Sequence, residues 1–250
     1  STIRLRAWSF DEAERIDADF FRRRLAVAVA MRSRLGLRSN GVRLVHGEAD
    51  GLPGLIVDRY EDILSVQFLA TGVERWKAVI ADALLAATGC TRLYERSDSS
   101  VRQLEGLEPV KGWLRGEGDT RVLLREHDIR LTVDVEAGHK TGYYLDQREN
   151  RALFARLVRQ LGCKSVLNCY SYTGGFSVSA LAGGATEVVS VDSSGPALAR
   201  ASAHVGLSGF DPAHHSMLDA DVTATLRQTP EGGRQLDDLV VVVGDTLLLE

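Results

Sequence analysis

The segment that decides the fold is SVLNCYSYTGGFSVSAL, residues 165–181, together with EVVSVD, residues 187–192. Residues 165–168 and 187–192 are apolar runs of the length of buried strands. Residues 176–181 predict a helix that is closed by Gly183 and Gly184. The order of strand, glycine-bearing loop, helix and strand predicts a parallel β-α-β unit.

The same alternation continues on both sides of this unit. Residues 196–205 predict a helix and residues 239–243 a further strand, and residues 146–161 predict a helix whose apolar face holds Leu153, Phe154, Leu157 and Leu161. Alternating helices and strands are typical of doubly wound parallel sheets. The predicted fold class is therefore α/β, with a Rossmann-like domain at residues 121–250.

The front of the chain follows another pattern. Residues 2–8 alternate as a short strand, and a helix capped by Asp17 or Asp19 is expected up to Gly36, with apolar positions Phe20, Phe21, Leu25, Ala28, Met31 and Leu35. Strands at 42–46, 55–60, 63–69 and 91–95, with a helix at 73–87, predict a compact β-β-β-α-β unit. A glycine-rich connector at 112–118 precedes a hairpin at 122–135. We expect an N-terminal strand and linker helix at 1–40 and a small α+β domain at 41–120, with a boundary near 110–125.

Composition narrows the class of protein. The 250 residues are 44% hydrophobic and 26% charged, which is typical of a folded chain with a substantial core. No apolar run approaches the roughly 20 residues that a membrane helix requires, so we expect no membrane partner. Three cysteines, Cys90, Cys163 and Cys169, without CxxC spacing predict neither a disulfide framework nor a metal site. We therefore expect a cytoplasmic protein.

The charges are unevenly distributed. Residues 1–135 carry 21 basic and 21 acidic side chains, whereas residues 136–250 carry 9 and 13. The first 38 residues hold nine arginines. Arginine forks pair with phosphate oxygens, so a nucleic acid would contact the front of the molecule, although a merely solvated surface explains the same count.

The spacing around Gly174 predicts the ligand class. In doubly wound sheets the ligand lies beyond the carboxyl ends of the strands, beside the first glycine-bearing loop. Asp192 ends the second strand 18 residues after Gly174, where a carboxylate can accept both hydroxyls of a ribose. A dinucleotide dehydrogenase needs GxGxxG for its pyrophosphate, and this loop has only Gly174 and Gly175, so S-adenosylmethionine fits better. Glycines that only turn the chain, with Asp192 as a helix cap, remain the alternative.

Three strings resemble one known family. GHKTGYYLDQR (138–148), VLNCYSYTGGFSV (166–178) and VVSVD (188–192) are similar to the RlmI family of S-adenosylmethionine-dependent 23S ribosomal RNA methyltransferases, which act on carbon 5 of a cytosine. The likeness extends through residues 4–10, 50–54 and 94–98, and so covers about residues 1–226. The resemblance implies a ribosomal RNA partner and an RNA-side role for the small middle domain.

The resemblance also implies a cofactor site. Asn168 and the following loop would line the methionine part, Asp192 would hold the ribose, and Asp221 would receive the adenine amino group. The implied set is Thr141, Tyr144, Gln147, Asn168, Tyr170, Ser171, Thr173, Gly174, Gly175, Phe176, Asp192, Ser193 and Asp221. Thr141, Tyr144 and Gln147 would close over the site from the preceding segment.

Two features of that family are missing from the sequence. The run at 238–243 is followed by Gly244 and Asp245 without the family's Asp-Pro-Pro loop, and no later Ser-Cys-Ser segment supplies a nucleophile. Carbon 5 of cytosine is a poor nucleophile, and a thiolate must add at carbon 6 before carbon 5 can accept a methyl group. Cys169 is expected to be a small buried thiol, so no catalytic residue is assigned. The family's N-terminal PUA domain would lie ahead of Ser1, so we expect this sequence to lack it and its Rossmann-like domain at 121–250 to be incomplete at the C-terminal end. The strand at 239–243 is then expected at a sheet edge, which would favour association such as a homodimer.

These departures leave three functions open. The first is an S-adenosylmethionine-dependent methyltransferase acting on cytosine of 23S ribosomal RNA. A guanine-directed ribosomal RNA methyltransferase of related fold needs no cysteine. A catalytically inactive homologue that binds S-adenosylmethionine or RNA would explain the missing proline loop.

Overall fold

The computed structural model describes residues 5–228, 239–243 and 246–247. The chain divides into two compact units: unit 1 comprises residues 1–124 and 133–145, and unit 2 comprises residues 125–132 and 146–250. Within the described residues, no helix is both long and apolar enough to cross a membrane.

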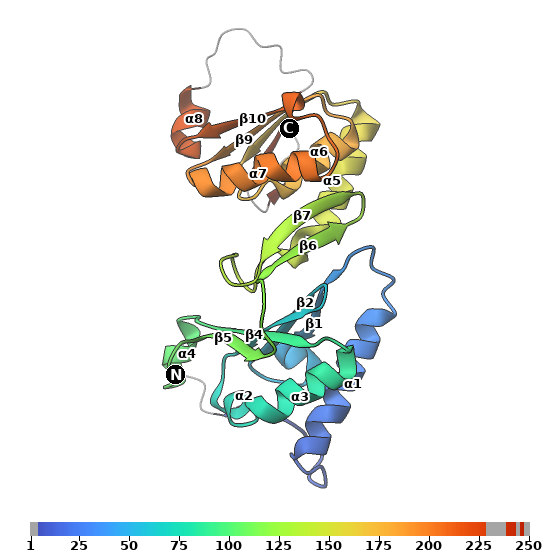
Figure 1. Ribbon diagram of the computed structural model, residues 1–250, viewed down its shortest axis with the longest axis vertical. Coiled ribbons are helices and arrows are strands. Elements are labelled where there is room, and N and C mark those ends of the chain that lie inside the picture. The colour runs from blue at the N-terminus through green and yellow to red at the C-terminus, as the bar shows by residue number, and fades with distance from the viewer. Residues whose placement is uncertain (1–4, 229–238, 244–245, 248–250) are drawn as a thin grey trace. The chain divides into compact units, whose positions relative to one another are not determined.

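Unit 1 is built on a five-stranded sheet with the order β1-β2-β3-β4-β5 (Figure 1). Its strands are β1 (Gly41–His46), β2 (Leu55–Tyr60), β3 (Ile63–Phe68), β4 (Arg92–Ser97) and β5 (Val110–Arg115). Only the β3–β4 pair is parallel, because the helices α2 (Thr71–Arg75) and α3 (Lys77–Thr88) form a crossover between them. The short helices η1 (Gly47–Asp50) and α4 (Val101–Leu104) lie in its connections.

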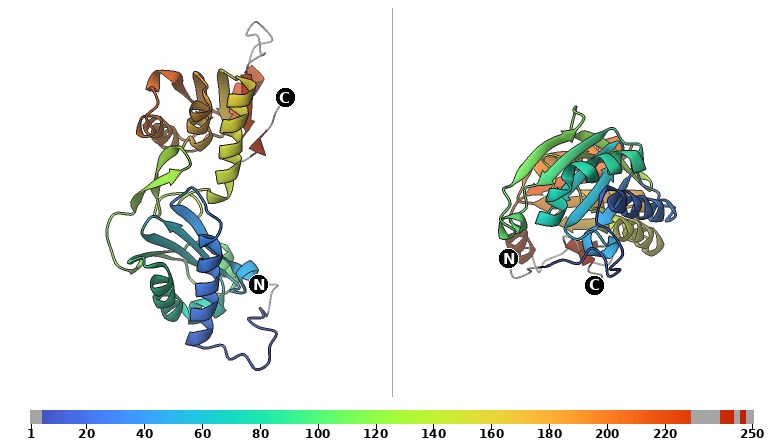
Figure 2. Two further views of the ribbon diagram at one scale, coloured as in Figure 1. Left: turned by 90° about the vertical axis from the view of Figure 1, so that its right-hand side faces the viewer. Right: turned by 90° about the horizontal axis from the view of Figure 1, so that it is seen from below.

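Helix α1 (Ala18–Ser33) shares its core with α3 and one face of this sheet (Figure 2). Asp17 caps the helix by accepting the backbone N–H of Phe20 at 3.0 Å, as the sequence predicted. Phe20, Phe21 and Leu25 are fully buried, but Met31 and Leu35 are largely exposed. The expected apolar face is therefore correct only for the first half of the helix.

Three expectations for unit 1 are wrong. Residues 5–8 form no strand, and Trp8 instead anchors this segment by packing its ring 5.2 Å from that of Phe21; residues 2–4 lie outside the described part. The connector at 112–118 is mostly strand β5, because Trp113 packs on Tyr94 of β4 and the backbone pairs with β4. The expected single helix at 73–87 is interrupted at Trp76.

The hairpin of β6 (Arg121–Glu126) and β7 (Ile129–Asp134) contributes to both units. Its tip, residues 125–132, belongs to unit 2, and its remaining residues belong to unit 1. We expected the hairpin to belong with the C-terminal domain.

Unit 2 contains a sheet with the order β10-β9-β8-β11-β12 (Figure 1). Its strands are β8 (Ser165–Cys169), β9 (Glu187–Asp192), β10 (His215–Asp219), β11 (Leu239–Val243) and β12 (Thr246–Leu247). The first four are mutually parallel, which confirms the doubly wound α/β class. Its helices are η2 (Leu145–Gln147), α5 (Arg148–Leu161), α6 (Gly175–Gly183), α7 (Gly195–Leu207), η3 (Pro212–His214) and α8 (Val222–Gln228).

The edges of this sheet differ from the expectation. Strand β11 is not the outermost strand, because Val242 and Val243 pair antiparallel with Leu247 and Thr246 of β12. Asp245, which stands in the sequence where the family has its proline loop, lies outside the described residues. The edge strand on the other side is β10, which the sequence pattern did not reveal.

Candidate functional site

The carboxyl edge of the unit 2 sheet has the arrangement that doubly wound proteins use for ligands. Strand order reverses between β8 and β11, so the connection that follows β8 opens beside the point of reversal. Asp192 ends β9 and Asp219 ends β10, and the two lie directly beside each other in the parallel register. Asp219 was not among the predicted site residues, although an acidic residue at a strand end would have been its signal.

The loop from Tyr170 to Gly174 is tightly wound. Tyr170, Tyr172 and Gly174 all have positive φ angles, of 53°, 48° and 74°. The turn is closed by the N–H of Gly174 donating to the carbonyl of Ser171 at 2.8 Å, and it is joined to β9 by the N–H of Ser171 donating to Val191 at 3.0 Å. Left-handed backbone at two non-glycine residues is costly and tends to occur at ligand sites.

Asp192 holds this loop directly. One carboxylate oxygen accepts the backbone N–H of Tyr172 at 2.8 Å, and the other accepts that of Ser194 at 2.9 Å. The N-cap of α7 is Ser194 rather than Asp192, so Asp192 is more than a helix cap. Each carboxylate oxygen can accept a second hydrogen bond, which leaves Asp192 able to receive ligand hydroxyls.

Ser171 provides the test of whether a polar ligand fits. Its hydroxyl is buried in the loop and has no hydrogen-bond partner within the described protein. An unsatisfied buried hydroxyl costs about 1–3 kcal/mol, and a polar group bound at the loop would recover it. These polar groups, a hydroxyl, the loop backbone and two carboxylates that accept hydrogen bonds, therefore fit an adenosine-type ligand that carries amino and hydroxyl groups.

The remaining loop residues differ in exposure. Tyr170 is 51% exposed, and its hydroxyl lies 3.4 Å from that of Thr223. Thr173, Gly174, Gly175 and Phe176 are buried. Phe176 packs edge-on against Phe154 of α5 with ring centroids 5.8 Å apart, so its aromatic ring supports the start of α6.

Asn168 turns its side chain into the core. Its amide Nδ2 donates to the Ser177 hydroxyl at 2.8 Å, the Ser177 and Ser190 hydroxyls are 2.6 Å apart, and Ser190 lies 2.8 Å from Nε2 of His215. This series of hydrogen bonds joins β8, α6, β9 and β10. Burial lowers the pKa of His215, which favours the neutral form of the ring at the last of these bonds. Asn168 therefore shapes the loop by tying α6 to the sheet.

Asp221 and Ser193 are exposed at the same edge. A carboxylate oxygen of Asp221 accepts the N–H of Ala224 at 2.7 Å and so caps α8. Cys169, at the end of β8, is fully buried, and burial raises the pKa of its thiol. As expected, Cys169 is not a poised nucleophile, because the reactive form of cysteine is the thiolate.

The three residues expected to close over the site lie in different units. Thr141 and Tyr144 belong to unit 1, and Gln147 belongs to unit 2. The buried Thr141 hydroxyl donates to the carboxylate of Asp58 and lies 3.2 Å from the hydroxyl of Tyr60. Gln147 accepts from the side chain of Asn150 at 2.8 Å. Contact of these three residues with a cofactor stays a prediction.

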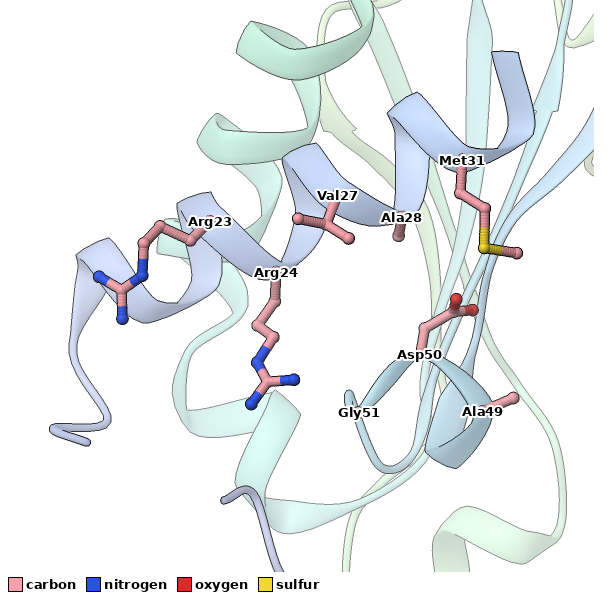
Figure 3. A pocket seen from close by; sticks show the side chains of 8 residues that line it. All are labelled: Arg23, Arg24, Val27, Ala28, Met31, Ala49, Asp50 and Gly51. Atoms are coloured by element: carbon pink, nitrogen blue, oxygen red, sulfur yellow. The ribbon is translucent and has the colours of Figure 1, made fainter. Parts of the chain in front are cut away.

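A surface depression of about 540 Å³ lies in unit 1, between α1 and the turn at 49–51 (Figure 3). Arg23 and Arg24 border it, but both contact Glu14, at 3.4 and 3.2 Å. Asp50, on the opposite side, is paired with Arg32 at 2.5 Å. Because Arg23, Arg24 and Asp50 each already contact a side chain of opposite charge, this depression is a weaker candidate for a cofactor site than the carboxyl edge of unit 2.

The strand reversal beside a glycine-bearing loop, with acidic side chains at neighbouring strand ends, defines the class of Rossmann-like α/β proteins. Residues 92–246 match the model of a protein family described as S-adenosylmethionine-dependent methyltransferase. The chain belongs to this family, whose cofactor is S-adenosylmethionine.

Two curated relatives are similar over nearly the whole chain. The ribosomal RNA large subunit methyltransferase I of Alteromonas mediterranea is 44% identical over 243 residues, which are 96% of this chain and 60% of the relative. The protein of the same name from Shewanella denitrificans is 45% identical over 246 residues, 96% of this chain and 61% of the relative. The chain thus spans about three fifths of the length of these relatives.

Solved structures agree with the fold. A protein from Streptococcus mutans assigned as an S-adenosylmethionine-dependent methyltransferase has a TM-score of 0.75 at 25% identity, covering 86% of this chain and 56% of its own. A second structure with the same TM-score and identity covers 86% of this chain and 55% of its own, and is described as a methyltransferase complexed with SAH.

Proposed function

We propose that this chain binds S-adenosylmethionine at the carboxyl edge of β8, β9 and β10 and serves the methylation of large-subunit ribosomal RNA, at carbon 5 of a cytosine in 23S RNA. The observation that carries the proposal is the 44–45% identity to ribosomal RNA large subunit methyltransferase I over 96% of the chain. A ribosomal RNA substrate would also place the protein in the cytoplasm.

The loop and the neighbouring strand ends would supply the contacts that this cofactor needs. Asp192 and Asp219 would accept hydrogen bonds from the ribose hydroxyls, and Ser171 would bond a polar group of the methionine part. Asp221 stands at the same edge for the adenine amino group. When bound, the cofactor supplies an electrophilic methyl group, and the acidic edge suits its positive sulfonium. Asn168 would affect cofactor binding indirectly, because its hydrogen bond to Ser177 holds α6 against β8.

Unit 1 would hold the RNA. Arg22 and Arg23 on α1 and Arg34 and Arg38 beyond it have exposed side chains, which suits contacts to phosphates. Such contacts would make RNA affinity fall with salt, by a slope of about one per phosphate contacted. The arginine-rich front of the sequence and the acidic surplus of unit 2 would then serve different ligands.

Calorimetry with S-adenosylhomocysteine tests cofactor binding without requiring turnover. Asp192→Asn should weaken binding by at least tenfold, since one acceptor of a charged hydrogen bond is worth about 1.5–3 kcal/mol. Asp211→Asn is the matched control, because Asp211 also accepts a backbone N–H at 2.9 Å, from Ala213, but lies on η3 away from the loop. Equal affinity of the two variants, or no binding by the wild type, would refute the site.

Methyl transfer is tested separately. The wild type, incubated with labelled S-adenosylmethionine and ribosomal subunits from cells lacking the modification, should label a cytosine in digested 23S RNA. Label in guanine would favour the guanine-directed enzyme. Cofactor binding without transfer would favour the inactive homologue, which the burial of all three cysteines also suits.

A further inference from the structure

A buried histidine outside the predicted site joins two parts of unit 2. His204 on α7 is 1% exposed, and its Nδ1 lies 2.8 Å from the carbonyl oxygen of Thr173. Thr173 belongs to the loop from Tyr170 to Gly174, which we call the cofactor loop. Nε2 of His204 accepts the backbone N–H of Thr132, in β7 of the hairpin, at 3.0 Å. One imidazole ring therefore spans the distance between the loop and the hairpin tip.

The hairpin tip is fastened to unit 2 at two further points. Glu126 and Arg151 of α5 form a bidentate ion pair at 2.6 and 2.8 Å, with side chains only 1% and 3% exposed. Ser208, at the end of α7, accepts the N–H of Arg130 and donates to its carbonyl, both at 2.9 Å. The hairpin tip is thus a docked element, and His204 is its contact with the cofactor loop.

The two hydrogen bonds determine the protonation of the ring. An acceptor Nε2 carries no proton, so the proton is on Nδ1, which donates to Thr173. The ring is therefore neutral, and burial lowers its pKa, with a smaller contribution from the charge of Arg200 on the same helix. A protonated ring would present N–H to the N–H of Thr132, and one of the two contacts would break.

We propose that His204 is a positioning residue that couples the cofactor loop to the docked β6–β7 hairpin, so that the loop holds S-adenosylmethionine well only while the hairpin is docked and the ring is neutral. This inference rests on the proposed cofactor site. Because β6 and β7 continue covalently into unit 1, displacement of the hairpin would act on the loop directly through His204.

Among the groups that form the hydrogen bonds at His204, only the imidazole ring can change its charge. Thr132 and Thr173, which bond it, are uncharged, and α6 has no ionisable side chain. Besides Arg200 on α7 itself, the charged and titratable groups of the elements packed here are Arg130, Asp134, Glu187, Asp192, His214, His215 and Asp219. His214 and His215 are further histidines among them, so a variant that removes only the titration of His204 is required.

The first test measures S-adenosylhomocysteine affinity at about pH 7.5 and about pH 5.5 by calorimetry. The wild type should bind more weakly at the lower pH, because a ring that becomes protonated in the unliganded protein must lose its proton before the hydrogen bonds to both Thr132 and Thr173 can form. His204→Gln keeps a donor and an acceptor but cannot titrate, so it should bind nearly as well at the higher pH and lose less affinity at the lower. His204→Phe keeps the ring volume without either bond and should bind about tenfold more weakly at both. His214→Gln, on exposed η3, should behave as the wild type.

The second test reads the hairpin itself by hydrogen exchange. Addition of S-adenosylhomocysteine should slow amide exchange at residues 129–133 in the wild type and in His204→Gln, but not in His204→Phe. If the wild type does not bind the ligand, the proposed function fails. If it binds and His204→Phe matches it in affinity and in hairpin protection, only the coupling is refuted. A pH dependence identical in the wild type and in His204→Gln would assign the effect to another titratable group and also refute the coupling.

Discussion

Gly174→Ala is the sharpest test of the loop geometry. The residue has a φ of 74°, and a Cβ built on it would lie 2.6 Å from Cβ of Ala201 and 3.1 Å from its Cα. Left-handed backbone costs alanine about 1–2 kcal/mol, and overpacking adds about 1–3 kcal/mol. We therefore expect unit 2 to lose about 2–5 kcal/mol and S-adenosylhomocysteine affinity to fall with it, because the loop must move away from α7.

The chain contains a matched control for this substitution. Gly162 has a φ of 69°, and nothing lies within 4 Å of a Cβ built there, so Gly162→Ala should cost only the backbone term, about 1–2 kcal/mol, and leave affinity unchanged. Adding Ala201→Gly to Gly174→Ala removes the closest contact and should recover about 1–3 kcal/mol beyond additivity.

Hydrogen exchange in α6 and α7 measures the stability of this region, and calorimetry measures the affinity. If Gly174→Ala and Gly162→Ala cost the same in both assays, the loop does not pack as described. If the double variant shows no coupling, Ala201 is not the residue that excludes a side chain at Gly174.

Three further outcomes follow from buried polar contacts. Arg151→Met strands a buried Glu126 and should cost about 3–5 kcal/mol in urea unfolding, whereas adding Glu126→Leu should recover most of the loss; equal losses would argue against a buried pair. Burial lowers the pKa of His204 and His215 below 6.5, so the unfolded chain binds more protons than the folded chain at acid pH. The free energy of unfolding should therefore be full above about pH 6.5 and fall below it, by up to about 1.4 kcal/mol per pH unit for each ring. A melting temperature that stays flat below that pH, or that falls equally when both histidines are replaced by Gln, would contradict this. Thr141→Val removes a hydroxyl that bonds a buried carboxylate and should cost about 1–2 kcal/mol; weaker S-adenosylhomocysteine binding would support the predicted contact of Thr141 with the cofactor, and unchanged binding would refute that contact.

Local pattern was enough to predict the strands that carry apolar runs. Residues 55–60, 187–192 and 239–243 are strands with the expected bounds, because each contains at least two consecutive β-branched or other apolar residues. The cap at Asp17 was also predictable, since its carboxylate acts three residues away. Signals of this kind are contained within one element.

Elements that depend on a distant partner were missed. Strand β10 has mostly exposed side chains and no apolar alternation, so only its backbone pairing with β9 makes it a strand. Strand β5 contains Gly112, which has a φ of 145°, and its place in the sheet depends on Trp113 packing against Tyr94. Neither sequence carries a local signal that outweighs its polar or glycine residues.

The candidate site shows the same division between position and orientation. The string at 166–178 and the spacing to Asp192 identify which residues stand at the strand ends, but not which way their side chains turn. Asn168 turns inward to Ser177, whereas Asp192 turns to the loop amides. His204, which fixes the loop from 31 residues away and the hairpin from 72, looks in the sequence like any histidine on a helix. A shared loop string therefore identifies the ligand class, while the residues that shape the loop are found only through their hydrogen-bond partners, and variants of those residues should separate affinity from folding.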